Sequence, residues 1–170
     1  MGANWQRVWV SIPKRYTPDE RRAIAQEIVE MIRKRTADGK DRRSNPFPNY
    51  SLAYRQSLDF KNAGKSASAV NLTLSGDMLG ALDVLSEKPG AVMIGFQNGT
   101  EENARADGNI RGTYGQPSPI PGKRRDFLGL TQAELKMILA RYPVNDDEAR
   151  QERTQTVLEA GATGSGISEE

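Results

Sequence analysis

Apolar and polar residues alternate in two short stretches of the chain, and each stretch predicts a β-strand. In residues 5–12 the apolar side chains of Val8, Val10 and Ile12 share one face, and a proline ends the pattern. Residues 91–96 alternate in the same way and follow a Pro-Gly turn. Alternation of this kind is typical of half-buried strands, so the sequence predicts a small, mainly antiparallel sheet.

A strong helix start follows the first predicted strand. Thr17 can cap the helix, Pro18 takes its first position, and Glu20 completes a capping box. The helical period continues to about Ala37, where Gly39 supplies a left-handed stop. The pattern predicts a helix about 28 Å long. Its expected buried stripe is Ile24, Ile28, Met31 and Ile32, and its expected opposite face is Arg22, Gln26, Glu30 and Arg33.

Two shorter helices are expected in the next part of the chain. The first occupies residues 50–60, and the second occupies residues 76–85 behind a Ser75 cap. Both have apolar residues at helical spacing. The expected inward-facing residues are Tyr50, Tyr54 and Leu58 in the first helix and Met78, Leu82 and Leu85 in the second.

Two more helices are predicted from their caps. A short polar helix begins after Thr100 and is stopped by Gly108. The last helix opens with a second capping box, Thr131 to Glu134, and ends at Pro143. Its expected buried residues are Leu135, Ile138 and Leu139.

Two long loops separate these elements. Residues 38–49 contain two prolines, which exclude a helix, and residues 109–122 are dominated by Gly and Pro. We expect both loops to be extended and to contact neighbouring molecules. Residues 1–143 then form one α+β domain with the sheet packed against the long N-terminal helix. Residues 144–170 form a C-terminal helix and a flexible arm that contacts neighbours, because they have few apolar side chains to bury.

The composition narrows the possible chemistry. The 170 residues include no Cys and no His, which excludes disulfides, zinc bound by Cys or His, a Cys nucleophile and a Ser-His-Asp triad. No apolar stretch reaches about 18 residues, and no export signal is expected at the N-terminus. Gly64, Lys65 and Ser66 match the end of a phosphate-binding loop, but Asp59 takes the place of its first glycine. We expect no enzyme activity, no cofactor and no membrane partner.

Charge is distributed unevenly along the chain. Residues 1–65 contain 14 Lys and Arg against 7 Asp and Glu, whereas residues 131–170 contain 4 against 8. The whole chain has a net charge of +2. A basic front and an acidic back suit either a head-to-tail contact between copies or a surface that faces DNA. Solvated faces on ordinary helices are the simpler interpretation of any single charged run.

Basic and aromatic residues supply the candidates for contacts with other molecules. Basic residues gather in two loops, where they can bind phosphates or pair with the acidic C-terminal third of another copy. Large aromatic side chains often anchor protein interfaces, and we expect this of Phe47 also, whereas core packing is the preferred assignment for Phe127. The candidates for a subunit interface or a DNA-facing surface are Lys40, Arg42, Arg43, Lys123, Arg124, Arg125, Trp5, Trp9 and Tyr114.

Carboxylates allow a different interpretation. Paired carboxylates can bind magnesium for phosphoryl chemistry, which would make the chain a metal-dependent nuclease. Three of them, however, fall in the first turns of predicted helices, where the helix dipole stabilises acidic side chains. No basic or hydroxyl partner is patterned around them, so we favour helix stabilisation and expect no metal. The residues concerned are Asp77, Asp83, Glu101, Glu102 and Asp107.

Two segments carry a resemblance to a known family. Residues 74–79 (Leu-Ser-Gly-Asp-Met-Leu) precede a strand with Val92 and Gly95 and then a polar helix. Residues 120–130 (Ile-Pro-Gly-Lys-Arg-Arg-Asp-Phe-Leu-Gly-Leu) lead directly into a capped helix. This order resembles the tail-completion or virion-morphogenesis proteins of long-tailed bacteriophages. Those proteins have a small-residue cap before a short helix, a Val-Gly strand, and a Pro-Ala-Arg-x-Phe-Leu-Gly loop before their last helix.

The resemblance covers residues 20–142 and is most specific at residues 125–130. The family often has an aromatic-His-Gln-Phe-Gly run in its central helix, and residues 103–109 take its place here without a histidine or an aromatic residue. The packing of this helix is therefore not carried over. The resemblance implies an α+β domain that assembles as a ring in the virion neck, between portal and tail tube, and it transfers no catalytic residue.

We therefore expect a structural virion protein at the head–tail junction of a tailed bacteriophage. It would assemble in the host cytoplasm as a closed sixfold ring around the DNA channel. Its partners would be copies of itself, adjoining neck and tail proteins, and the DNA in the lumen, contacted without sequence specificity. The alternative is a basic nucleic-acid-binding accessory protein, and a weaker one is the metal-dependent nuclease.

Overall fold

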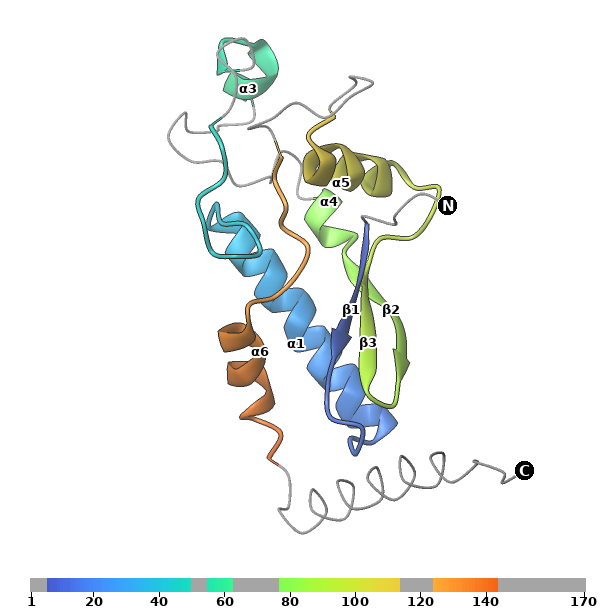
Figure 1. Cartoon of the computed structure of the whole chain (residues 1–170). Coiled ribbons are helices and arrows are strands. Elements are labelled where there is room, and N and C mark those ends of the chain that lie inside the picture. Colours follow the sequence, from blue (N-terminus) through green and yellow to red (C-terminus); the bar gives the residue numbers. More distant parts are fainter. Residues whose placement is uncertain (1–5, 50–54, 63–76, 114–123, 144–170) are drawn as a thin grey trace, which may run out of the picture.

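Helix α1 (Pro18–Ala37) lies between the β-sheet on one side and helix α6 (Gln132–Leu139) on the other (Figure 1). The computed structural model describes residues 6–49, 55–62, 77–113 and 124–143. The other helices that lie wholly within these ranges are α3 (Leu58–Asn62), α4 (Asp77–Gly80) and α5 (Glu101–Arg111). The fold is α+β, as the sequence predicts.

The sheet is antiparallel, as expected. Its three strands, in spatial order, are β1 (Arg7–Ser11), β3 (Ala91–Gly95) and β2 (Asp83–Lys88). A bulge between Val84 and Ser86 shifts the register of β2 against β3. Close packing of β1 against β3 requires Gly95, because a Cβ atom there would lie 2.3 Å from the carbonyl oxygen of Gln6.

The buried stripe predicted for α1 is confirmed. Ile24, Ile28 and Ile32 are completely buried, and Met31 packs against the core from its edge. Both predicted capping boxes are present as well, at the start of α1 and at the start of α6. Local signals at the two ends of the domain are therefore sufficient to fix these helices.

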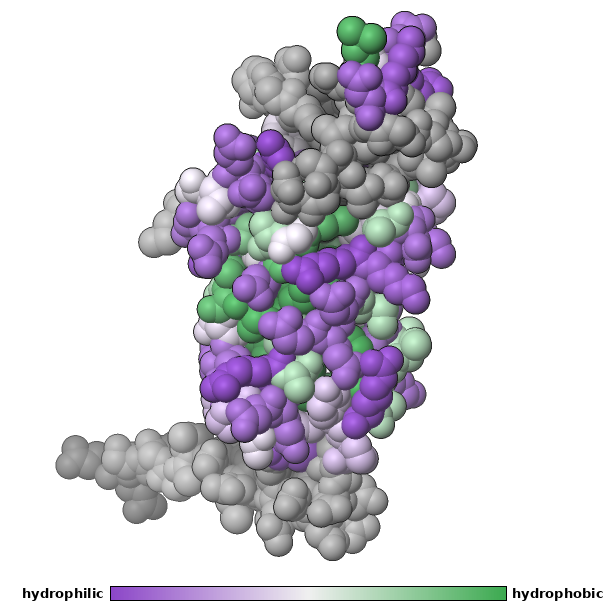
Figure 2. Space-filling model, turned by 180° about the vertical axis from the view of Figure 1, so that it is seen from behind, coloured by the Kyte–Doolittle hydropathy of each residue, from purple (hydrophilic) through white to green (hydrophobic). Residues whose placement is uncertain are grey.

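The core lies between the sheet and α1 and continues beneath the segment that precedes α6. The rings of Phe96 and Phe127 meet edge to face, with centroids 6.2 Å apart, and neither is exposed. This confirms core packing for Phe127. Phe47, by contrast, was expected at an interface, but it is only 6% exposed and belongs to the core. Seen from behind, the rest of the described surface is largely hydrophilic, with apolar areas in its middle (Figure 2).

The helix predicted over residues 76–85 is wrong beyond its first turn. The chain forms α4 and then strand β2, and Arg33 explains the change. Its guanidinium donates hydrogen bonds to the carbonyl oxygens of Leu79, Gly80 and Leu82 at 2.9, 3.0 and 2.7 Å. These bonds satisfy carbonyls that a longer helix would otherwise use. Arg33 was expected on the solvent face of α1, so this contact corrects that expectation too.

Two other boundaries differ from expectation. Helix α5 passes through Gly108 and ends at Arg111, where Gly112 has the left-handed conformation (φ 71°). Burial of Ile110 (1% exposed) favours the extra turn, because it outweighs the modest penalty of a glycine inside a helix. In the region of residues 50–60, Arg55 is helical and α3 covers Leu58–Asn62, but the Leu58 side chain is 73% exposed instead of inward. Tyr50 and Tyr54 lie outside the described residues.

Candidate functional site

The first of the two loops that contain clustered basic residues, residues 38–49, is folded on itself and is not extended. The backbone N–H of Asp41 donates to the carbonyl of Asn45 at 2.8 Å, and Lys40 forms a β-bridge with Pro46. The Asp41 carboxylate accepts hydrogen bonds from the backbone N–H groups of Arg43 and Asn45, each at 2.9 Å. This is a compact turn held by its own backbone, which corrects the expectation of an extended loop at residues 38–49.

Residues 124–131, the second basic loop, lie against the first. The backbone N–H of Arg42 donates to the carbonyl of Asp126 at 2.9 Å, and the Arg42 guanidinium pairs with the Asp126 carboxylate at 3.0 Å. Gly129 lies beneath the Arg42 side chain, where a Cβ atom would be 3.0 Å from the Arg42 Cδ atom. Residues 38–49 and 124–131, more than eighty positions apart in the sequence, therefore lie side by side. Together they are the joined loops.

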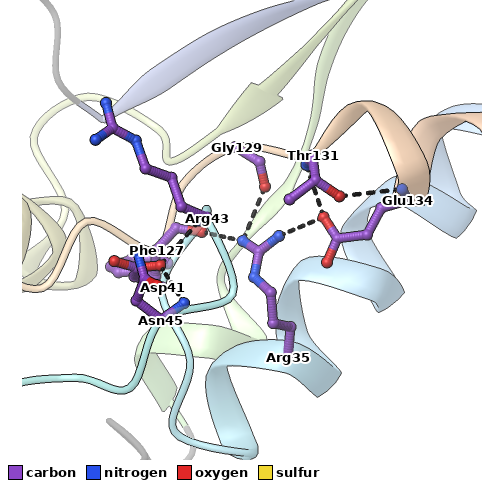
Figure 3. Close-up of polar contacts among 8 residues, drawn as sticks. All are labelled: Arg35, Asp41, Arg43, Asn45, Phe127, Gly129, Thr131 and Glu134. Atoms are coloured by element: carbon purple, nitrogen blue, oxygen red, sulfur yellow. Dashed lines mark hydrogen bonds and ion pairs between the residues drawn. The ribbon is translucent and has the colours of Figure 1, made fainter.

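Arg35, in the last turn of α1, binds the joined loops from the interior of the molecule (Figure 3). Its guanidinium donates to the carbonyl oxygens of Phe127 and Gly129 at 2.7 and 2.8 Å and to the carboxylate of Glu134 at 2.7 Å. Arg35 is only 5% exposed, and burial lowers its pKa, although the neighbouring Glu134 carboxylate opposes this shift. The charge is thus held in the interior by an ion pair and by two backbone carbonyls.

The second basic loop is also attached to the C-terminal end of α5. The backbone N–H of Arg125 donates to the carbonyl of Asn109 at 2.7 Å, and Nε of Arg124 donates to the carbonyl of Ile110 at 3.2 Å. Both bonds satisfy carbonyls in the last turn of a helix, where cationic side chains are also favoured by the dipole. The motif that carries the family resemblance is therefore a structural junction between α1, α5 and α6.

Five of the six basic residues predicted to make contacts are described, and they fall into three groups. Lys40, Arg43 and Arg124 are exposed, and the side chain of Arg43 extends away from the Arg35 cluster (Figure 3). Arg42 is partly exposed and paired with Asp126. Arg125 is buried at 6% exposure, so its side chain does not contribute to the surface of this chain. Lys123, Trp5 and Tyr114 lie outside the described residues.

Among the described residues, Trp9 is the predicted aromatic contact that lies at the surface. It is 45% exposed and lies on the face of the sheet that points away from α1. The ammonium group of Lys88 lies 4.5 Å from the centre of its ring, a cation–π arrangement. A large ring that is half exposed on an open sheet face is available for contact with another molecule.

Three of the five carboxylates considered for magnesium have other partners in the structure. Glu101 pairs with Arg105 and Asp107 pairs with Arg111, each one helical turn apart in α5. The carboxylate of Asp83 accepts a hydrogen bond from the next backbone N–H at 2.7 Å. Across the described ranges, no three acidic, His or Cys residues are grouped so that they could hold a metal ion. The structure therefore offers no observation that favours the nuclease alternative.

Sequence reasoning missed the buried arginines of α1. Arg35 is three residues after Ile32 and seven after Ile28, so it continues the buried stripe of the helix. Arg21 is three residues before Ile24 on the same stripe, and it pairs with Glu87 of β2. The signal that could have identified them is a basic residue at a position of the buried stripe, because a charged group is buried only where it has partners.

Comparison with models of protein families, with curated proteins and with solved structures gives no match. Among the helices that the structure describes, none combines the length and the apolar character needed to cross a membrane. Three features of the chain bear on its function: the two joined loops, the open face of the sheet, and the motif at residues 125–130.

Proposed function

We propose that this chain is a structural subunit of the head–tail junction of a tailed bacteriophage, which assembles as a closed sixfold ring around the DNA channel. The observation that carries the proposal is the junction at residues 125–130. The motif shared with the tail-completion family is held by Arg35 and Arg42 through hydrogen bonds to its backbone. A motif used in this way supports a role in building a rigid subunit and needs no catalytic chemistry.

The joined loops also support an orientation within the ring. They place three exposed cations, Lys40, Arg43 and Arg124, in two segments that meet at Arg42 and Asp126. Exposed cations on a fixed backbone can contact DNA phosphates at any sequence, which is what a channel that passes a genome requires. We infer that this surface faces the lumen, with adjoining neck and tail proteins stacked above and below the ring in the virion.

Ring closure requires two unlike surfaces on each subunit, because rotational symmetry places one surface against a different one on the next copy. This chain offers two unlike features for such a contact: a sheet face with an exposed Trp9, and a C-terminal sequence at residues 144–170 that is rich in acidic residues. A symmetric two-fold dimer would need neither. The unlike surfaces therefore support a cyclic assembly over an isologous one.

The first experiment measures assembly directly. Native mass spectrometry and negative-stain electron microscopy of the purified full chain should show a discrete ring of six subunits. A monomer or an isologous dimer at all accessible concentrations would contradict the proposal. A monomer that binds DNA tightly would instead support the accessory nucleic-acid-binding protein, which the same basic surface also favours.

A matched pair of variants tests the orientation. Arg43→Glu changes an exposed cation in the joined loops, and Arg22→Glu makes the same charge change on an exposed face near the other end of α1. If the loops face DNA, Arg43→Glu should leave the ring intact, weaken DNA binding and reduce the salt slope by about one phosphate contact. Arg22→Glu should change neither. Equal effects of the two variants would show that only net charge matters.

A further inference from the structure

The open face of the sheet has a defined chemical character. Trp9 pairs across the sheet with Met93, which in turn pairs with Ser86, so an aromatic, an apolar and a small polar side chain form one row. The opposite face, with Val10 and Val92, is the one that α1 covers. The row is therefore accessible to solvent, and its largest side chain, Trp9, is 45% exposed.

Basic side chains predominate around this row, although the acidic Asp83, which pairs with Gly95 on the strand opposite Arg7, also lies on this face. Lys88 lies over the Trp9 ring, and Arg7 occupies the same face two residues before Trp9. The Lys14 side chain lies at the turn between β2 and β3, with Cγ 3.2 Å from the position that a Cβ atom of Gly90 would take. Two copies of this face would repel each other. The face therefore needs an acidic partner that also has apolar side chains.

The remainder of the same chain has these properties. The described ranges contain 20 Lys and Arg against 15 Asp and Glu, a balance of +5. Residues 144–170 contain 2 basic residues against 7 acidic ones, a balance of −5, and they include the apolar Val157, Leu158 and Ile167. The acidic residues outside the described ranges all belong to this segment. Body and segment are therefore complementary in charge.

The segment also begins in a suitable place. The carbonyl of Tyr142 accepts a hydrogen bond from the Tyr16 hydroxyl at 2.8 Å, so the described chain ends beside the connection between β1 and α1. The turn between β2 and β3 lies at this same end of the molecule (Figure 1). From there, 27 residues can span about 90 Å when extended, which is enough to reach an adjacent subunit.

We propose that the acidic segment 144–170 of one copy docks on the basic face around Trp9 and Lys88 of the next copy. This inference rests on the proposed ring, for which it supplies the heterologous contact. The apolar residues of the segment cover Trp9 and Met93, while its carboxylates approach Lys88, Arg7 and Lys14. Because each copy carries one segment and one face, every contact uses a different surface on each partner.

A complementation experiment with full-length chains tests the docking. A face variant carries Trp9→Ala and Lys88→Glu, and a segment variant carries Asp146→Asn, Asp147→Asn, Glu148→Gln and Glu152→Gln. Each variant alone should remain a single subunit, because one half of every contact is missing. Mixed at equal concentration, they should form pairs and nothing larger, since the intact segment of the face variant meets the intact face of the segment variant. The pairs should dissociate at 1 M salt, where screening acts within about 3 Å.

The outcomes separate this inference from the proposed function. Rings formed by the segment variant alone would overturn the docking and leave the ring intact. A wild-type chain without rings would contradict the proposed function, and docking would then be measured with a synthetic peptide of residues 144–170. In a Trp5→Phe segment variant, which retains Trp9 as its single tryptophan, the peptide should protect Trp9 from acrylamide quenching and a scrambled peptide should not. A different result would overturn the inference: Trp9 already protected from quenching in a dilute wild-type monomer, and unchanged by added peptide. The segment would then be bound to its own chain and not to the next copy.

Discussion

Arg35 and Glu134 are 99 residues apart in the sequence, and their side chains meet at 2.7 Å in the interior. The oxygen of Glu134 that accepts this bond also accepts the backbone N–H of Thr131 at 2.8 Å, as the capping box of α6 requires. One carboxylate oxygen therefore serves both the last turn of α1 and the first turn of α6. This contact makes the capping motif of α6 part of the tertiary structure and fixes the two helices against each other.

Removal of the Arg35 side chain should therefore strongly destabilise the folded chain. Arg35→Ala leaves the Glu134 carboxylate without its cation and leaves the carbonyls of Phe127 and Gly129 without a donor. We expect the free energy of unfolding to fall by about 3–5 kcal/mol, as for other broken buried ion pairs. Urea denaturation followed by circular dichroism measures it.

The control for this prediction is Arg22→Ala, which removes an arginine from the same helix where its side chain is 63% exposed and paired with Asp19. That change should stay within about 0.5 kcal/mol. A double-mutant cycle between Arg35 and Glu134 isolates the pair, and Glu134→Gln keeps an acceptor for the capping box. Equal decreases in the free energy of unfolding for Arg35→Ala and Arg22→Ala would show that the buried ion pair stabilises the fold no more than the exposed one.

Gly129 provides a second test of the junction. Its φ angle is 155°, and a Cβ atom would lie 3.0 Å from Cδ and 3.3 Å from Cβ of Arg42. Gly129→Ala should therefore lower the free energy of unfolding by about 1–3 kcal/mol, through backbone strain and displacement of Arg42. Gly80→Ala is the control, because nothing lies within 4 Å of the added atom. A neutral Gly129→Ala would mean that the Arg42 side chain moves aside without loss.

The signals that predicted the fold correctly are local. The capping box of α1 is complete within Thr17 to Glu20, and the stripe of isoleucines behind it needs no distant partner. Strand β2 could not be predicted in this way. Its alternation is interrupted by a bulge, and the helix before it is ended by Arg33, which is 46 positions from the first carbonyl it binds. A contact of this separation leaves no pattern in a single sequence.

The candidate site shows the same division. Clustering of basic residues identified Lys40, Arg43 and Arg124 as surface cations, and all three are exposed. The same clustering also included Arg125, which is buried, because composition does not distinguish a surface charge from one that enters the interior. The burial of Arg125 follows from the attachment of its backbone to α5, which is a tertiary contact.

Phe47 and Trp9 should respond in opposite ways to truncation. Both were expected at an interface, but Phe47 is 6% exposed and Trp9 is 45% exposed. Phe47→Ala should cost about 3–5 kcal/mol in the free energy of unfolding, because it opens a cavity in the core. Trp9→Ala should cost much less in stability and should act instead on association. Analytical ultracentrifugation together with urea denaturation separates the two effects, and similar losses of stability would contradict the assignment of Trp9 to the surface.

Tyr16 and Tyr142 predict how stability depends on alkaline pH. The Tyr16 hydroxyl donates to the carbonyl of Tyr142, and the Tyr142 hydroxyl donates to the carboxylate of Glu27 at 2.8 Å. Burial raises the pKa of both tyrosines above the ordinary value of 10.0, and for Tyr142 the neighbouring Glu27 raises its pKa further.

The sign of this effect follows from proton linkage. A raised pKa in the folded state means that the folded chain keeps these protons at a pH where the unfolded chain releases them. The stabilisation is therefore complete below pH 10 and is lost as the pH rises from about 10 through the higher pKa values of the folded state. Denaturation at pH 8, 9.5 and 10.5 should show a steeper loss for the wild-type chain than for the double variant Tyr16→Phe, Tyr142→Phe. The double variant should be less stable at pH 8, since it lacks both hydrogen bonds, and should lose less on further alkalinisation. Parallel curves for the two proteins would show that these two hydroxyls do not govern the alkaline limit.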